Sequence, residues 1–260
     1  MLVASWNING VKARIDGLTT WLKERSPDIA CLQEIKSQDE GFPRAAIEDL
    51  GYHVETHGQK GFNGVALLSK TKPESVLRGL PHDESDEQAR YIEGVWTGEA
   101  GPLRVASIYL PNGNPLGTPK FDYKLSWMER LERHAKDLLL KEEMLVLAGD
   151  FNVIPQPEDV HNPNAWLEDA LYQPQSRGGL RRLVHLGLAD ALRMTDDRSE
   201  IYTFWDYQAG AWQKNNGIRI DHLLLSPEAQ VALRSVGTDS HVRSWEKPSD
   251  HVPIMAEIAA

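Results

Sequence analysis

Met144-Leu145-Val146-Leu147-Ala148 is an apolar run followed directly by Gly149-Asp150-Phe151-Asn152. A short apolar run that ends in turn residues indicates a buried strand. Side chains along a strand alternate between its two faces, so Asp150 and Asn152 are expected to point the same way where this strand ends. A charge buried there is costly unless it has partners or a task. An Asx-rich turn that caps the strand is the alternative interpretation.

Other apolar runs end in polar residues in the same manner. Each such ending places carboxylate, amide or imidazole groups at the end of a predicted strand, and their recurrence favours a shared site over a set of isolated turns. The endings are Asn7-Ile8-Asn9-Gly10 after Val3–Trp6, Gln33-Glu34 after Ile29–Leu32, Asp221-His222 after Ile218–Ile220, and Ser249-Asp250-His251 before residues 252–258.

Strand and helix signals alternate along the chain, which predicts an α/β fold. Helical spacing indicates one helix that ends near Pro27, a second through 125–138, a short one between Pro43 and Gly51, and one closed by Gly187. No low-complexity linker interrupts the pattern, so residues 1–260 are expected to form a single domain. Strand-like runs lie near 2–6, 28–33, 52–56, 64–69, 91–96, 103–109, 144–149, 219–225 and 252–258.

Two segments about a hundred residues apart resemble each other. Residues 3–7 read Val-Ala-Ser-Trp-Asn and residues 105–109 read Val-Ala-Ser-Ile-Tyr. Each precedes a predicted helix and then a strand that ends in an acid, Glu34 in the first half and Asp150 in the second. The pattern suggests two similar halves whose strand ends converge on one cleft. Chance similarity of two buried strands is the alternative.

Charge and composition exclude few functions. With 28 basic and 38 acidic residues the net charge is −10, but exposed charges beyond roughly 10 Å are screened, so local charge decides binding. The single cysteine, Cys31, lies in an apolar run and makes a thiol mechanism improbable. No segment is apolar enough for a membrane helix, and we expect a cytoplasmic protein that does not bind membranes. Basic residues near the strand ends are Lys12, Arg14, Lys36, Lys120, Lys124 and Arg219, with a predicted loop over 174–182 that carries Arg177, Arg181 and Arg182.

These residue types suit metal-assisted hydrolysis of a phosphate ester. Carboxylate and amide oxygens are the ligands that Mg²⁺ or Mn²⁺ prefers, whereas no cysteine and histidine set has zinc spacing. Glu34 is the leading candidate ligand. His251 paired with Asp221 or Asp150 would be held in one tautomer with a raised pKa, as acid and base roles require. Asn7, Asn9 and Asp250 are the neighbouring candidate ligands.

The chain resembles the exonuclease III family of apurinic/apyrimidinic endonucleases, within the endonuclease/exonuclease/phosphatase superfamily. The resemblance covers essentially the whole chain and rests on seven motifs in order. They are Trp6-Asn7-Ile8-Asn9-Gly10, Leu32-Gln33-Glu34-Ile35-Lys36, Tyr109-Leu110-Pro111-Asn112-Gly113, Gly149-Asp150-Phe151-Asn152, Tyr202-Thr203-Phe204-Trp205-Asp206-Tyr207, Arg219-Ile220-Asp221 and Ser249-Asp250-His251-Val252-Pro253.

The resemblance implies a DNase I-like four-layered α/β sandwich of two packed, mostly antiparallel sheets flanked by helices. It also implies roles for the motif residues. Glu34 would be the principal Mg²⁺ ligand, assisted by Asn7 and Asp250. Asp150 and Asn152 would orient the attacking water and, with His251, form a second metal site, while Asp221 would hold His251. Tyr109 and Asn112 would bind the phosphate, with Asn9, Lys36 and Arg219 as further phosphate or DNA contacts.

A pocket for the base-free sugar is also implied by the resemblance. Phe204, Trp205, Ile218 and Ile220 match it, although a Phe-Trp pair is also ordinary core material. Such an apolar slot would admit an extruded abasic sugar and resist a full nucleotide. Asn9 stands where some relatives carry aspartate, and Ile218 is smaller than the tryptophan of another branch.

The sequence therefore predicts a Mg²⁺-dependent DNA-repair nuclease that cuts 5′ to abasic sites, with 3′ to 5′ exonuclease or 3′-phosphodiesterase activity beside it. The expected partner is duplex DNA with abasic sites or blocked 3′ ends, bound by a monomer. Two alternatives remain, namely a general DNase or other phosphoester hydrolase, and a non-catalytic nucleic-acid-binding regulator.

Overall fold

The apolar run 144–148 forms most of strand β8 (Met144–Asp150), and all seven of its residues are buried. It pairs in parallel with β7 (Gly101–Tyr109), which places Tyr109 opposite Asp150. In the first half β1 (Leu2–Asn7) pairs in parallel with β2 (Ile29–Gln33), which places Asn7 opposite Gln33. The two similar segments of sequence therefore occupy equivalent strands.

The computed structural model describes all 260 residues as two six-stranded sheets with the same neighbour pattern. The first has the order β11-β12-β1-β2-β4-β3 and the second β5-β6-β7-β8-β10-β9. Each contains one parallel pair, β1 with β2 and β7 with β8, and every other pair is antiparallel. The predicted mostly antiparallel sheets and the predicted duplication are thus both confirmed.

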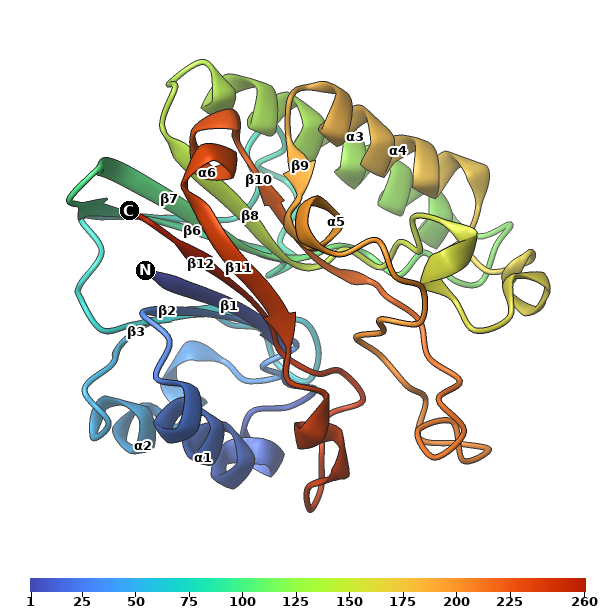
Figure 1. The fold of residues 1–260 in the computed structure, drawn as a ribbon, viewed down its shortest axis with the longest axis horizontal. Helices are drawn as coiled ribbons and strands as arrows, with labels where there is room; N and C mark the ends of the chain where they lie inside the picture. The colour runs from blue at the N-terminus through green and yellow to red at the C-terminus, as the bar shows by residue number, and fades with distance from the viewer.

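Helices cover the outer faces of the two sheets and complete the four layers (Figure 1). In that view α1 and α2 lie below the first sheet, and α3 and α4 lie above the second. The helices are α1 (Ile15–Arg25), α2 (Arg44–Glu48), α3 (Pro119–Leu139), α4 (Pro174–His185), α5 (Ala191–Thr195) and α6 (Pro227–Ala232), and the remaining strands are β3 (His53–His57), β4 (Val65–Ser69), β5 (Ser75–Arg78), β6 (Tyr91–Gly98), β9 (Ala189–Asp190), β10 (Asp221–Leu225), β11 (Leu233–Thr238) and β12 (Ile254–Ile258).

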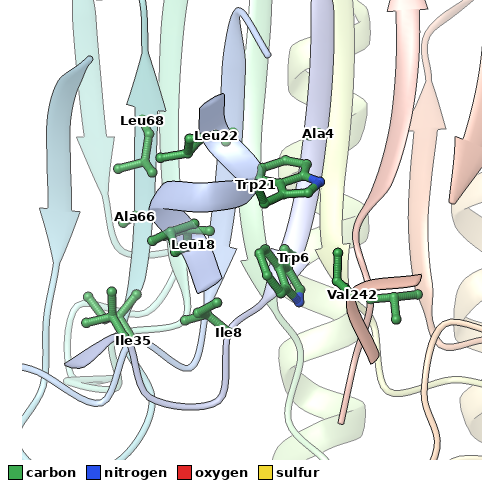
Figure 2. Close-up of a cluster of buried hydrophobic side chains, with 14 of the residues drawn as sticks. Ala4, Trp6, Ile8, Leu18, Trp21, Leu22, Ile35, Ala66, Leu68 and Val242 are labelled. Carbon is green, nitrogen blue, oxygen red and sulfur yellow. The ribbon is translucent and has the colours of Figure 1, made fainter. Parts of the chain in front are cut away.

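Three apolar clusters separate the layers, because neighbouring residues of each central strand face opposite ways. Val3 packs between the sheets, whereas Ala4 faces α1. Figure 2 shows that outer cluster, in which the rings of Trp6 and Trp21 meet edge to face with centroids 5.4 Å apart. The indole N–H of Trp6 donates to the backbone oxygen of His251 at 3.1 Å, so this core also supports a candidate catalytic segment.

Gly149 explains why a glycine precedes Asp150. A Cβ at this position would lie 2.0 Å from the backbone oxygen of Ile108 on the neighbouring strand β7. Only glycine allows β7 and β8 to approach this closely just before their polar ends. Substitution by alanine would push the two strand ends apart.

The structure differs from the sequence-based expectations at two helices and at the sheet edges. The segment 174–182, predicted as a loop, lies in helix α4, and the helix predicted through 125–138 begins earlier, at Pro119, so that Lys120 lies in its first turn. Strands β5, β9 and β11 were not predicted; each lies at a sheet edge, where half-exposed strands lack a continuous apolar run. None of the helices has the length and apolar character needed to cross a membrane.

Candidate active site

The ends of β1, β2 and β8 meet at one edge of the two sheets. One amide nitrogen, Nδ2 of Asn7, donates to Oε1 of Glu34 and to Oδ2 of Asp150, both at 2.9 Å. Asn7 is fully buried at the end of β1, and Glu34 follows β2 with a positive φ of 48°. The acids from the two halves are therefore joined through a single side chain. The convergence predicted from the repeat is present.

His251 lies between the carboxylates of the second sheet. Its Nδ1 lies 2.8 Å from Oδ2 of Asp221, which starts β10, and its Nε2 lies 3.7 Å from Oδ2 of Asp150. The ring of Phe204 packs edge to face on the imidazole with a centroid distance of 5.0 Å. The Asp221 contact orients the imidazole so that Nε2 faces the site.

Asn9, Asp250 and Lys36 form the outer rim of the site. Nδ2 of Asn9 donates to Oδ1 of Asp250 at 3.1 Å, and Nζ of Lys36 donates to Oδ1 of Asn9 at 2.6 Å. Lys36 also lies 3.0 Å from Oε2 of Glu34. Tyr207, an exposed aromatic that the sequence did not single out as a site residue, contacts Asn9 through its hydroxyl at 3.3 Å. This rim combines positive and negative groups around Glu34.

Asn152 and Asn112 follow β8 and β7 and lie side by side. Nδ2 of Asn112 donates to Oδ1 of Asn152 at 3.3 Å, and Nδ2 of Asn152 donates to the backbone oxygen of Leu110 at 2.8 Å. The backbone N–H of Asn152 donates to Oδ1 of Asp150 at 2.9 Å. The Asx turn considered from the sequence is therefore present, and it belongs to the site.

Burial and charge set the protonation of this cluster. Burial opposes ionisation of Glu34, but the hydrogen bond from Asn7 and the charge of Lys36 lower the pKa of its carboxyl below the ordinary value. Burial, reinforced by the charges of Asp221 and Glu34, raises the pKa of Asp150. Burial, together with the charges of Glu34 and Asp150, raises the pKa of Tyr109 well above its ordinary range. Tyr109 is therefore a neutral phenol that can donate a hydrogen bond. The pKa values of the two acids are shifted in opposite directions, that of Glu34 downward and that of Asp150 upward.

A cavity of about 270 Å³ opens beside the acids. Its apolar wall includes Phe204, Ile218 and Ile220, three of the four predicted pocket residues. The sequence missed the rest of the lining because it comes from the loop between β7 and α3 and from the segment between β8 and α4, neither of which has strand or helix periodicity. Trp166, an aromatic residue amid prolines and asparagines, was the only sequence signal of the segment between β8 and α4. The additional lining residues are Asn114, Trp166, Asp169 and Leu171.

Trp205 does not line this cavity and Arg219 is buried, so the predicted pocket role of Trp205 and the predicted phosphate or DNA contact of Arg219 are wrong. Both follow a pocket residue in extended backbone and therefore point the opposite way. Trp205 packs on Trp212 with a centroid distance of 4.8 Å and borders a different cavity. The guanidinium of Arg219 is 1% exposed and reaches Asp159 and Asp190, each at 2.7 Å, and not the phosphate position.

The ion pairs of Arg219 predict a large structural effect. Arg219→Met leaves the part-buried Asp190 without its guanidinium partner and the buried Asp159 with Arg193 alone, and removal of one member of such a largely buried set costs about 3 kcal/mol or more. Urea unfolding should show this loss. Arg198→Met, which breaks an ion pair of an exposed arginine with Asp196, is the control and should change stability little. Equal, small losses in the two variants would contradict a structural role for Arg219.

The cluster has the donors that a divalent cation requires. Ligand atoms of Glu34, Asp150 and His251 all lie within 4.8 Å of one another. Oδ1 of Asp221 is buried without a hydrogen-bond partner, while Oδ2 of the same carboxylate lies against His251. Oxygen-rich sites of this kind suit Mg²⁺ or Mn²⁺ better than zinc. The residues present therefore fit a metal ion.

Comparisons with a protein family and with individual proteins show similarity over nearly the whole chain. The model of a family described as the endonuclease/exonuclease/phosphatase family matches residues 4–251. Exodeoxyribonuclease III of Haemophilus influenzae is 37% identical over 265 residues, covering 99% of both chains. The DNA repair nuclease APEX1 of Danio rerio is 33% identical and covers 100% of this chain and 82% of its own.

Solved structures agree with this chain along its full length. The 3′ phosphatase NExo from Neisseria, bound to a product DNA hairpin, superposes with a TM-score of 0.95 at 37% identity and 100% coverage of both chains. An AP endonuclease from Archaeoglobus fulgidus superposes with a TM-score of 0.94 at 35% identity, again with 100% coverage of both chains. The similarity thus extends over both sheets and all the site-bearing strand ends.

Proposed function

The chain belongs to the endonuclease/exonuclease/phosphatase family, and from that premise we propose that it is a DNA-repair nuclease cutting duplex DNA 5′ to abasic sites. Its relatives of 33 to 37% identity include an exodeoxyribonuclease III and a DNA repair nuclease. Cleavage would leave a 3′-hydroxyl and a 5′-deoxyribose phosphate. A solved relative described as a 3′ phosphatase supports activity on blocked 3′ ends as a second reaction of the same site.

One observation carries the proposal. The acids of the two halves, Glu34 and Asp150, share one donor on Asn7, and His251 completes the cluster beside a cavity with an apolar wall. A phosphodiester needs charge neutralisation, a base for water and donors for the developing charge. All three kinds of group stand at this one place, and neither a turn nor a folding core requires such a set.

The protein groups divide the chemistry between them. Asp150 accepts the proton of the attacking water, which the amide of Asn152 holds in place. His251, oriented by Asp221, donates a hydrogen bond to the scissile phosphate. Tyr109 donates to a phosphoryl oxygen as a neutral phenol, without adding net charge. Glu34, assisted by Asn7 and Asp250, would hold Mg²⁺, which would neutralise the phosphoryl charge.

The pocket gives a physical basis for abasic selectivity. Phe204, Ile218 and Ile220 offer an apolar wall next to His251, and Trp166 and Leu171 extend the same apolar cluster. A deoxyribose without its base has lost its stacking, so its extrusion costs less than that of an intact nucleotide. We therefore propose that shape and the low cost of extrusion select the substrate.

An incision assay tests this proposal directly. One duplex oligonucleotide with a single abasic site is compared with undamaged duplex, with a duplex carrying a 3′-phosphate and with a soluble phosphodiester, each with Mg²⁺ and with EDTA. We expect Mg²⁺-dependent incision 5′ to the abasic site as the fastest endonucleolytic reaction. Equal cleavage of undamaged DNA would indicate a general DNase, and DNA binding without any cleavage would indicate a regulator.

Glu34→Gln should weaken the metal site more than the fold. The amide keeps the shape of the side chain but removes the charge, so half-maximal incision should need at least about ten times more Mg²⁺, with a slower rate at saturation. Calorimetric titration of Mn²⁺ measures the affinity independently of cleavage. Glu48→Gln, a change on the exposed side of α2, is the control. A wild-type rate for Glu34→Gln in saturating Mg²⁺ would refute this metal assignment.

Three further properties stay predictions from the sequence. The shared core between the sheets supports action of residues 1–260 as one domain. A monomeric state and a cytoplasmic location complete the proposal, and sedimentation and fractionation would measure them.

A further inference from the structure

Lys124 is a buried amine that the proposed chemistry does not use. It lies in α3, has no exposed surface, and its Nζ donates to two backbone oxygens, those of Asn112 at 3.0 Å and Asn152 at 2.5 Å. These two residues follow the parallel strands β7 and β8. One ammonium group thus joins the main chains of the two loops whose side chains meet at the site.

The surrounding chain makes room for this lysine. Gly113 has a φ of 91°, and a Cβ there would lie 2.7 Å from Cδ of Lys124. The glycine after Asn112 therefore lets the lysine stem pass beneath the loop. Burial lowers the pKa of Lys124 to about 7, although the charges of Asp150 and Asp169 act in the opposite direction. Maintaining an amine at such a place is costly for a purely structural residue.

The backbone of Asn152 needs such support. Asn152 has a φ of 46°, in the left-handed region that few residues other than glycine adopt readily. In this conformation its Nδ2 donates to Leu110 and its Oδ1 lies 3.3 Å from Nδ2 of Asn112. The hydrogen bond from Lys124 to the carbonyl oxygen of Asn152 restrains the backbone of that residue. Loss of the bond would free both amides to turn away from the site.

We propose that Lys124 is a positioning residue for catalysis, which clamps the Asn112 and Asn152 loops so that the two amides face one phosphate and its attacking water. The inference rests on the proposed phosphodiester hydrolysis. It assigns Lys124 no contact with the substrate, so its effect should fall on turnover and not on DNA binding. An error of about 1 Å in such a constellation is enough to slow a reaction roughly 100-fold.

The first test replaces Lys124 by methionine, which keeps the length of the stem and removes the donors. Lys124→Met should lower kcat at least about 10-fold, with KM and the Kd for duplex in EDTA within about 3-fold of wild type. Lys124→Arg, which keeps donors and charge, should recover part of the loss. Lys136→Met, an exposed lysine on the same helix, is the control for charge and should leave kcat unchanged.

A double-mutant cycle with Asn112→Ala separates positioning from general stability. If Lys124 acts through these amides, the second substitution adds little to the first, whereas independent losses multiply. Multiplying losses, or a wild-type kcat for Lys124→Met, would overturn the inference. The comparison uses whichever DNA phosphodiester the wild-type enzyme cleaves fastest, so a failed abasic preference would correct the proposed function and still decide the role of Lys124.

Discussion

Asp150→Asn is expected to reduce single-turnover incision by about 10³-fold or more, within the range that loss of a general base produces. The amide has nearly the same shape as the carboxylate, so its oxygen can still accept the backbone N–H of Asn152. It can no longer take a proton from water. The nitrogen would also face Nδ2 of Asn7, a donor that now loses one acceptor.

The stability of Asp150→Asn distinguishes lost chemistry from unfolding. Burial and the charges of Asp221 and Glu34 raise the pKa of Asp150, which means that its ionised form is disfavoured in the fold. Removing that charge should offset the cost of the lost acceptor for Asn7, so the melting temperature should stay close to the wild-type value. Asp137→Asn, an exposed aspartate on α3, is the matched control and should keep full activity. A rate for Asp150→Asn near that of the control would remove the residue from the mechanism.

His251→Asn is expected to lower kcat by about 100-fold or more while KM stays within about 3-fold. The asparagine nitrogen replaces Nδ1 and can keep the bond to Asp221, which is 2.8 Å long in the native protein. The substitution thus removes only Nε2, the atom that lies 3.7 Å from Asp150 and faces the site. Steady-state kinetics on the abasic duplex measures the division between kcat and KM.

Two comparisons define what the His251 result means. His251→Gln places an amide nitrogen nearer to the position of Nε2 and should recover part of kcat. His53→Asn, on the exposed edge strand β3, is the control for the chemical change itself. If kcat and duplex affinity fell by equal factors, His251 would mainly position DNA.

The central strands could be predicted from the sequence because they are buried on both faces and therefore appear as continuous apolar runs. The run 144–148 and the similar segments at 3–7 and 105–109 became β8, β1 and β7, in equivalent places of two equivalent sheets. Edge strands such as β11 lacked that signal, because one side of each faces solvent. Local apolar content therefore predicted the middle of each sheet and one border strand, β3, but not the border strands β5, β9 and β11.

Alternation along extended backbone decided which candidate residues reach the site. Phe204 lines the cavity and the adjacent Trp205 does not, and the same holds for Ile220 and Arg219. Similarity to a motif identifies the segment that reaches the site, but it does not show which of two neighbouring side chains faces the cavity, because both belong to the same motif. The basic residue expected at the phosphate instead neutralises Asp159 in the interior.

By itself the sequence determined the polar strand ends, including Gly149-Asp150-Phe151-Asn152, as the place of the chemistry, and it determined the family to which the chain belongs. Only the tertiary structure decided that one amide of Asn7 joins Glu34 to Asp150, and that Lys124 lies beneath both asparagine loops. The physical reason is that these contacts join separate elements. Strand endings follow from local patterns of burial, whereas contacts between residues of different strands, helices and loops, such as Asn7 with Asp150 of the other sheet, depend on how those elements pack.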